Sequence, residues 1–583
     1  MKKTLSMICL FLCAVMLLSA CDKGEITDRG DNTVVTETNT QEVTTGNSSD
    51  LNDTVTLVKD GEALFCILAE DKGCDEYAER LQNSLLDKMG INFTIVKKSE
   101  DVGDKPCMRL CIAEPSEMVK MGVNLTYSGY GTIYYEGDLY FCAYDLGGVG
   151  KAVLKWTSSI LDDYLKRDGS RTLEANIPKS TLFVYSPKYP VSVPKLLGAP
   201  LSDYVIVVPA SISDSDRSVL DIAVKKIGLQ TGVMMTVTDD TTIPTQREIR
   251  IGNTCRTESV AEEYSFGAYT VKSDETCINI GYGGALALYC GVNELVSDFL
   301  AKSVKPQYNV NATVQTTLIK DDLNRLSQSS DVTIMSSNML FAIPNDISGL
   351  LNNDARMKLL GEYYLMIGAD SVGLQECIIN DNVNLLTPVI TDMYAFVPYN
   401  ELASGEKIIY RKDKQTLIKH GIIDLGSNYA FMWALFENKT TSERYIHANL
   451  HYHYDGDAKR LLQAEKVNEE LKKLYTTYAD VPIFVTGDYN TKINSSVHSA
   501  MTEGVKMKSA VELAPDNARD YNAKSFHTLD VYGSMQSTNC EQIDHIMVTW
   551  DRADVILHAI LHNEPLAYST DHCPIIIKAN FKK

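Results

Sequence analysis

Carboxylate and amide side chains follow short apolar runs in the second half of the chain. In VPIFVTGDYNT, residues 481–491, an apolar run that predicts a strand ends at a glycine, so Asp488 and Asn490 lie just beyond its carboxyl end. The same pattern ends VTIMSSN at Asn338 and SVGLQE at Glu376. The first stretch alone is also typical of an ordinary turn. Because ligands of α/β sheets tend to bind at this rim, the repeated pattern favours a functional site.

All ten histidines of the chain fall at or after His420. Histidine is the usual side chain for proton transfer near neutral pH, so this uneven distribution indicates that a catalytic site would lie in the second half of the chain. His447, His451 and His453 lie close together, and the residues leave open which of them acts. The spacing to Arg460 favours His451, and a transition-metal site at His451 and His453 is the alternative.

Two acid–histidine pairs lie near the end of the chain. They are Asp544–His545 in QIDHIMV and Asp571–His572 in STDHCPIII, the latter just ahead of a final strand. Neighbouring side chains of a strand point to opposite faces, so His545 is interpreted as structural. Cys573 is interpreted as a packed thiol.

Helices must position these strand ends. Apolar residues at helical spacing predict one helix over 354–370, before SVGLQE, and another over 458–475, which leads into PIFVTGDYN. A helix followed by a strand with a polar end therefore occurs twice, which is typical of an α/β fold. Arg356 and Arg460 are interpreted as surface residues of these helices.

In this order the motifs resemble the endonuclease/exonuclease/phosphatase superfamily. The resemblance covers about residues 331–583. It rests on Asn338, LQE at 374–376, NLHYH at 449–453 followed by RLLQ at 460–463, GDYN at 487–490, IDH at 543–545 and TDH at 570–572. It implies a four-layer α/β sandwich, two β-sheets flanked by helices, that hydrolyses a phosphate ester with the help of a metal ion.

The resemblance also implies a role for each residue. Carboxylate and amide oxygens suit Mg²⁺, with Mn²⁺ as the alternative. The implied metal ligands are Glu376, Asn338 and Asp571. The implied catalytic residues are Asp488, which positions or deprotonates water; Asn490, which holds the phosphate or Asp488; His572, which contacts a phosphoryl oxygen or acts as base; Asp544, which orients His572; and His451, which stabilises the transition state.

Two departures from the family bear on the substrate. Leu340 stands where nucleases of this group often have a second acid, and His453 stands where many relatives have an acid. Residues 331–583 carry 23 Lys and Arg against 32 Asp and Glu, a net charge of −9. The whole chain carries a formal charge of −21, which argues against a broad basic surface for nucleic acid. A role in DNA repair is therefore disfavoured.

The amino terminus predicts export. Two lysines precede an apolar run over residues 5–18, followed by LSAC, which resembles a bacterial lipobox. We expect residues 1–21 to be a signal peptide, with Cys21 as the lipidated first residue of a membrane-anchored protein that faces outside the cytoplasm. No later segment is long and apolar enough to span a bilayer. Residues 22–53 are polar and predict a flexible stalk.

Two segments of the first half look alike. GTIYYEGDLYFCAYDLGG (131–148) and GAYTVKSDETCINIGYGG (267–284) share the spacing of Gly, Asp and Gly-Gly. They predict a duplicated α/β unit over 54–190 and 191–325, with chance similarity as the alternative. The units loosely resemble small α/β domains that precede catalytic domains in some bacterial glycoside hydrolases, which implies at most an accessory role. A glycan is the candidate ligand of these units. The polar stretch 321–331 predicts a linker.

The chain has 14 cysteines and no C-x-x-C. Eleven remain beyond the predicted signal and lipidation residues, an odd number, and most are interpreted as small buried hydrophobes.

Taken together, the motifs and the amino terminus predict an extracytoplasmic, magnesium-dependent phosphoesterase. Candidate substrates are phospholipids, extracellular nucleic acid, and sugar or inositol phosphates. The alternative is a surface lipoprotein without turnover that binds a glycan or a partner through its repeats.

Overall fold

The computed structural model describes most of the chain beyond residue 52. The described ranges are 42–44, 53–71, 73–112, 121, 127–143, 146–159, 164–169, 171–179, 182–256, 264–300, 307–341, 351–378, 382–520, 528–529, 535–536 and 542–583. The predicted signal peptide, Cys21 and most of the predicted stalk lie outside them. Within that stalk, Glu42–Thr44 form strand β1, which pairs with β11 (Phe183–Tyr185).

Two sheets of the first half share one strand order. In the first, β5, β4, β6 and β8 are parallel neighbours, followed by antiparallel β7 and β11; in the second, β15, β14, β16 and β18 are followed by antiparallel β17 and β19. The elements of the first are β4 (Cys66–Leu68), α2 (Asp75–Met89), β5 (Ile95–Val96), β6 (Cys107–Ile112), β7 (Tyr130–Tyr135), β8 (Asp138–Ala143) and α4 (Leu146–Ser159). Those of the second are β14 (Val205–Val208), α5 (Asp214–Thr231), β15 (Thr236–Asp239), β16 (Glu248–Ile251), β17 (Ala268–Ser273), β18 (Ile278–Tyr282), α6 (Ala285–Leu300) and β19 (Asn309–Thr313). A duplicated unit would have this pattern.

Smaller elements complete this half. A four-stranded sheet contains β2 (Thr54–Lys59), β3 (Glu62–Ala63), β9 (Leu165–Asp168) and β10 (Arg171–Pro178), and β12 (Lys195–Leu196) pairs with β13 (Ala199–Pro200). The predicted linker is wrong at its start, because α7 (Lys320–Arg325) occupies it. Leu323 and Leu326, three residues apart, pack into a hydrophobic core, which explains the helix.

The second half contains two six-stranded sheets. The β20 sheet has the order β22-β23-β21-β20-β33-β32, and the β27 sheet has the order β24-β25-β26-β27-β31-β28. The strands of the β20 sheet are β20 (Val332–Asn338), β21 (Ser371–Gln375), β22 (Tyr394–Phe396), β23 (Lys407–Arg411), β32 (Ala553–Ile560) and β33 (Ile575–Phe581). Those of the β27 sheet are β24 (Gln415–Gly426), β25 (Tyr429–Asn438), β26 (Arg444–His451), β27 (Ile483–Asp488), β28 (Met507–Ser509) and β31 (Asp544–Thr549).

The helices of this half are short except for two. They are α8 (Asn353–Ile367), α9 (Asn384–Ile390), α10 (Asp457–Thr477), α11 (Ser496–Thr502), α12 (Ala510–Leu513) and α13 (Glu564–Ala567), and β29 (Thr528–Leu529) pairs with β30 (Met535–Gln536). The predicted helices over 354–370 and 458–475 correspond to α8 and α10. Among the residues described, no helix combines the length and the apolarity needed to cross a membrane.

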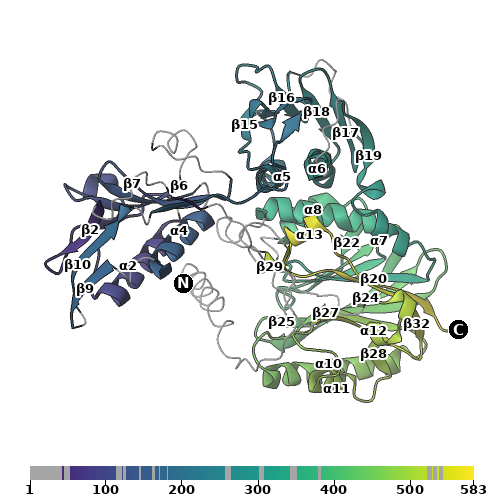
Figure 1. Cartoon of the computed structure of the whole chain (residues 1–583). Helices are drawn as coiled ribbons and strands as arrows, with labels where there is room; N and C mark the ends of the chain where they lie inside the picture. Colours follow the sequence, from purple (N-terminus) through teal and green to yellow (C-terminus); the bar gives the residue numbers. More distant parts are fainter. Residues whose placement is uncertain are drawn as a thin grey trace. The chain divides into compact units, whose positions relative to one another are not determined.

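Apolar side chains of both sheets form one core between them. Ile334 and Ile577 of the β20 sheet share it with Met432 and Phe484 of the β27 sheet. α10 packs its Val467 and the neighbouring apolar positions on the other face of the β27 sheet, and α8 covers the β20 sheet (Figure 1). Each fully buried aliphatic side chain contributes about 1.5–3 kcal/mol to the free energy of unfolding relative to an exposed one. The packing of these apolar faces therefore holds the strands that carry the site in place.

A layer of polar side chains crosses the core beneath the strand ends. Gln375 Nε2 donates to Asn449 Oδ1 at 2.6 Å, and Thr486 Oγ1 donates to the same oxygen at 2.9 Å. The ring nitrogens of His447 contact Ser371 Oγ at 2.7 Å and Thr486 Oγ1 at 2.9 Å. These hydrogen bonds join the two sheets and help to fix their relative position, although Gln375 Oε1 is buried without a hydrogen-bond partner among the described residues.

The close approach of the two sheets requires a glycine at position 373. A Cβ atom there would lie 2.0 Å from Thr486 Oγ1 and 2.6 Å from Asn449 Oδ1. Such contacts are far inside van der Waals distance, so any larger residue must push the β20 and β27 sheets apart.

We expect Gly373→Ala to lower the free energy of unfolding by about 1–3 kcal/mol, the usual cost of overpacking a core. Gly405→Ala is the matched control, because its Cβ would meet no atom closer than 3.8 Å. Urea unfolding followed by fluorescence measures both variants. Equal stability of the two variants would contradict the close approach of the sheets.

Candidate active site

The register of the β27 sheet places three polar side chains next to one another. β26 runs parallel to β27, and β31 runs antiparallel to it, so His451, Asp488 and Asp544 are direct neighbours on three adjacent strands. Neighbouring strands lie about 4.8 Å apart, and residues at one register position point to the same face. The three side chains therefore meet at one edge of the sheet.

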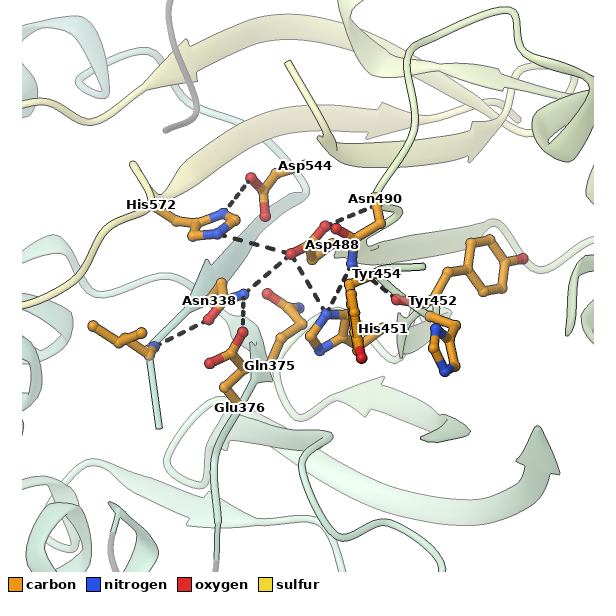
Figure 2. A network of polar contacts seen from close by, with 12 residues as sticks. Asn338, Gln375, Glu376, His451, Tyr452, Tyr454, Asp488, Asn490, Asp544 and His572 are labelled. Atoms are coloured by element: carbon orange, nitrogen blue, oxygen red, sulfur yellow. Dashed lines mark hydrogen bonds and ion pairs between the residues drawn. The ribbon is translucent and has the colours of Figure 1, made fainter. Parts of the chain in front are cut away.

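The β20 sheet brings its polar strand ends to the same place. Asn338 ends β20, Glu376 follows the parallel strand β21, and Asp571 and His572 precede the antiparallel strand β33. Asn338 Nδ2 donates to Glu376 Oε1 at 3.1 Å and to Asp488 Oδ2 at 3.2 Å (Figure 2). This amide links the two sheets at the site.

Asp488 is the centre of the polar network in Figure 2. Its Oδ2 lies 3.6 Å from His451 Nε2 and 3.8 Å from His572 Nε2, and its Oδ1 accepts a hydrogen bond from the backbone N–H of Asn490 at 2.8 Å. Only 2% of Asp488 is exposed. A buried carboxylate held in this way has a fixed orientation and can accept a proton from water.

His572 and Asp544 form a hydrogen-bonded pair. His572 Nδ1 and Asp544 Oδ2 are 2.8 Å apart, so Nε2 of the ring faces Asp488. Burial lowers the pKa of His572, but the neighbouring carboxylates of Asp544 and Asp571 outweigh it and hold this pKa well above its usual range. Burial raises the pKa of Asp544 to about 6, against the charge of His572. The pair therefore favours an imidazolium next to a carboxylate.

The side-chain amide of Asn490 is aimed at His451. Asn490 Nδ2 donates to the carbonyl of Tyr452 at 2.9 Å and lies 3.1 Å from His451 Nε2. With one amide hydrogen on each partner, Nε2 of His451 accepts, and the proton of the neutral ring sits on Nδ1. Asp488 and Asn490, which follow the apolar run of β27, thus belong to one site and not to an isolated turn.

Backbone strain gathers at the strand ends. Leu340, Glu376 and Asn490 have φ angles of 56°, 56° and 48°, in the left-handed region that side chains rarely adopt. Each of these residues lies one or two positions after a strand end, where the chain turns. Next to these turns, Leu340 N–H donates to Asn338 Oδ1 and Phe341 N–H donates to Glu376 Oε2, both at 3.0 Å. Strain of this kind concentrates at functional sites.

The three neighbouring histidines occupy different surroundings. His451 lies among Asp488 and Asn490, whereas His447 lies in the polar layer of the core, and burial lowers its pKa to about 3. His453 is held outside the network, where its Nδ1 accepts from the N–H of Asp455 at 3.0 Å. Of the three, His451 is the one whose ring faces the carboxylate.

Two groups of side chains have the chemistry to hold a metal ion. Asn338, Glu376 and Asp571 offer only oxygen ligands, and Asp571 Oδ1 is buried with no hydrogen-bond partner among the described residues. Asp488, Asp544 and His572 also lie close enough together to hold an ion. Asp544 and His572 already pair with each other, whereas Asp571 Oδ1 of the first group is free for a cation. Asn338 Oδ1 and the two Glu376 oxygens each accept a hydrogen bond, and the oxygen donors of this group fit Mg²⁺.

The interpretation of Arg356 as a surface residue is wrong. Arg356 is 1% exposed, and its guanidinium donates to the carbonyls of Ser569 at 2.6 Å, Met339 at 2.5 Å and Leu340 at 2.6 Å. It therefore ties the loop after β20 to the loop that carries Asp571. Arg460 pairs with Asp457, as a surface helix residue would, but it also donates to the carbonyls of His453 at 3.1 Å and Tyr454 at 2.9 Å.

Two residues near the site lie outside the sequence motifs. The ring of Tyr429 packs edge-on against His451, with centroids 5.2 Å apart. Glu406, in the loop before β23, is 1% exposed. Burial and the charges of Glu376 and Glu406 raise the pKa of Tyr429. No sequence signal marks these two residues, since each reaches the site only through the fold.

The comparisons with known proteins concern the fold. No protein-family profile and no curated protein matches the chain. Solved structures do match: a mannosyl-6-phosphatase of Bacteroides thetaiotaomicron is 21% identical over 43% of this chain and 99% of its own, with a TM-score of 0.37. A Bacteroides vulgatus endonuclease/exonuclease/phosphatase is 23% identical over 44% and 100%, with a TM-score of 0.38. The chain is thus similar in fold to a structure that carries the family name which the sequence motifs indicate.

A third structure is the human Nocturnin catalytic domain with a bound sulfate anion. It is 17% identical over 44% of this chain and 99% of its own, with a TM-score of 0.36. The likeness to these structures is one of fold.

Acid should destabilise the protein through His447. Its folded pKa of about 3 lies below the ordinary value near 6.5, so the unfolded chain binds the extra proton and stability falls as the pH drops below about 6.5. We expect His447→Gln to reduce the loss of unfolding free energy between pH 7 and pH 5 by roughly 2 kcal/mol. Urea unfolding at both pH values measures this, and an unchanged loss would contradict it.

Proposed function

We propose that the protein is a metal-dependent phosphoesterase that hydrolyses its substrate by attack of water. One observation carries this proposal: Asn338, Glu376, Asp488, Asn490 and the His572–Asp544 pair meet at one edge of two packed sheets. Hydrolysis of a phosphate ester needs charge on the phosphoryl oxygens, a deprotonated water and a stabilised leaving oxygen. The converging residues have the chemistry for each.

Glu376, Asn338 and Asp571 would hold Mg²⁺, or Mn²⁺ in its place. All three offer oxygen atoms, and Asp571 Oδ1 has no hydrogen-bond partner within the described part of the chain. A bound ion would supply positive charge to the phosphoryl oxygens. The strained backbone of Glu376, with a φ angle of 56°, fixes the direction of its carboxylate.

Asp488 would orient the attacking water and accept its proton. The N–H of Asn490 holds one oxygen of Asp488, which leaves Oδ2 toward the two imidazole rings. His572, oriented by Asp544 at 2.8 Å, would contact a phosphoryl oxygen through Nε2. Asn490 would hold Asp488 or the phosphate.

His451 would stabilise negative charge in the transition state. Its Nε2 lies 3.6 Å from Asp488 Oδ2 and 3.1 Å from Asn490 Nδ2, and its side chain is 10% exposed, so the ring lines the edge of the site with little contact with water. A positioned imidazole near developing charge contributes typically about 10²–10⁴ in rate.

The substrate proposed is a phosphate ester of modest size. Phospholipids, extracellular nucleic acid and sugar or inositol phosphates are the candidates, and the structures of similar fold include a mannosyl-6-phosphatase. The net charge of −9 over residues 331–583 disfavours a long polyanion.

The remaining proposals concern the organisation of the chain. Residues 1–21 would direct export, Cys21 would carry the lipid, and residues 22–53 would form the stalk. The shared strand order of the two first-half sheets supports a duplicated unit over 54–190 and 191–325, with a glycan as its proposed ligand. Residues 331–583 would form the catalytic four-layer sandwich.

The proposal predicts metal-dependent turnover of a nitrophenyl phosphate. We expect the chain without its signal peptide to release nitrophenol from bis(p-nitrophenyl) phosphate or p-nitrophenyl phosphate with Mg²⁺, and to lose this activity with EDTA. Asp488→Ala should lower kcat by about 10²–10⁴-fold, because it removes the group that accepts the proton of water.

The matched control for this assay is Asp480→Ala, which removes an exposed carboxylate outside the site. It should retain full activity. Turnover that survives both EDTA and Asp488→Ala would contradict the proposed site. The preferred reagent would then separate a diesterase from a monoesterase.

A further inference from the structure

Two cysteines of the first α/β unit, residues 54–190, face each other across neighbouring strands. Cys66 begins β4 and Cys107 begins β6, and the parallel pairing of these strands makes the two residues direct partners in the register. Residues at one register position point to the same face of a sheet. The two Sγ atoms lie 3.5 Å apart, so the thiols are in direct contact.

The backbone at this pair has the spacing that a disulfide needs. Neighbouring strands lie about 4.8 Å apart, and the Cα atoms of bridged cysteines lie about 4.4–6.8 Å apart. The two sulfur atoms must approach from 3.5 Å to about 2.05 Å, the length of an S–S bond. A small rotation of the two side chains can supply this movement without a change in the strand pairing.

The other contacts of the two thiols are weak. Cys66 Sγ donates to the carbonyl of Pro106 at 3.9 Å, and Cys107 Sγ donates to the carbonyl of Lys105 at 3.8 Å. A thiol is a weak donor, so little is lost when these protons leave.

The surroundings of the pair are apolar. Cys66 is 4% exposed and Cys107 is 1% exposed, and they pack with Leu68, Val96 and Val102 in a small hydrophobic cluster. A disulfide has no charge and no strong hydrogen-bonding group, so this cluster can bury it as readily as it buries two thiols.

We propose that Cys66 and Cys107 form a disulfide that joins β4 to β6 when the chain folds under oxidising conditions. The oxidant is the disulfide of a small thiol or of an oxidoreductase. The thiolate of one cysteine attacks it to give a mixed disulfide, and the second cysteine then displaces the remaining thiol. Two S–H bonds are lost and one S–S bond forms, while the oxidant takes up the two electrons and two protons as two thiols.

The bond would form as the chain folds. Burial and the neighbouring Cys66 raise the pKa of Cys107 to about 12, so its thiol stays protonated once the cluster has closed. Only a thiolate attacks a disulfide, and it must be accessible to the oxidant. The proposed export would bring the folding chain to a compartment in which such bonds form and persist.

The bond would stabilise the first unit. It closes the loop over residues 66–107, which contains α2 and β5, and thereby restricts the unfolded chain. It also holds β4, and with it the edge strand β5, to the rest of the sheet. Because both thiols belong to the first unit, the inference does not depend on the proposed phosphoesterase activity.

Refolding in a glutathione buffer tests the proposal. The chain without its signal peptide is unfolded in urea with dithiothreitol and then refolded in glutathione and its disulfide. The remaining thiols are alkylated in denaturant, and the unreduced peptides are mapped by mass spectrometry. We expect a cross-linked peptide that joins Cys66 to Cys107, about 2 Da lighter than the two reduced peptides together. Cys290, whose Sγ accepts from Thr317 Oγ1 at 4.0 Å, should be recovered as an alkylated thiol.

Thermal unfolding provides a second readout. We expect dithiothreitol to lower the Tm of the first unit in the oxidised chain by about 5 °C or more, because reduction releases the loop. Cys66→Ala should abolish this response. Cys290→Ala is the matched control, since it also removes a buried thiol, and it should retain the response. Recovery of both Cys66 and Cys107 as alkylated thiols, or a bond from Cys107 to another cysteine, would overturn the proposal.

Discussion

The site depends on one register: the pairing of β26, β27 and β31 that places His451, Asp488 and Asp544 side by side. A shift of one residue on β27 would turn Asp488 to the opposite face and bring Gly487 or Tyr489 to its place in the register. The apolar residues of β27 face the shared core and α10, so burial resists that shift. The hydrophobic pattern that stabilises the sheet therefore also keeps the side chains of His451, Asp488 and Asp544 next to one another.

The second sheet is held to the first by polar contacts. Gly373 allows the close approach, and the layer of Gln375, Asn449 and Thr486 fixes it. Within the β20 sheet, Arg356 ties the loop after β20 to the loop that carries Asp571. Inside a protein each such buried group must find its partner. The site is thus a consequence of how two sheets satisfy their buried polar groups, and its strained backbone turns are supported by them.

The sequence predicted the parts of the site that follow strand ends. Apolar runs that stop at Asn338, Glu376 and Asp488 are visible without a structure, and helical periodicity predicted α8 and α10 close to their observed bounds. Glu406 and the burial of Arg356 could not be predicted, because a charged residue in a loop or on a helix is usually solvated. Both side chains are buried only because distant segments pack around them.

The most direct test of this account is whether the oxygen ligands around Glu376 bind a divalent cation. Calorimetric titration of the chain with Mn²⁺, and with Mg²⁺ in competition, measures it for the native protein and Glu376→Gln. The account predicts one site per chain for which both ions compete, weakened at least about tenfold by the substitution. Equal binding by both proteins, or no binding by the native chain, would contradict it.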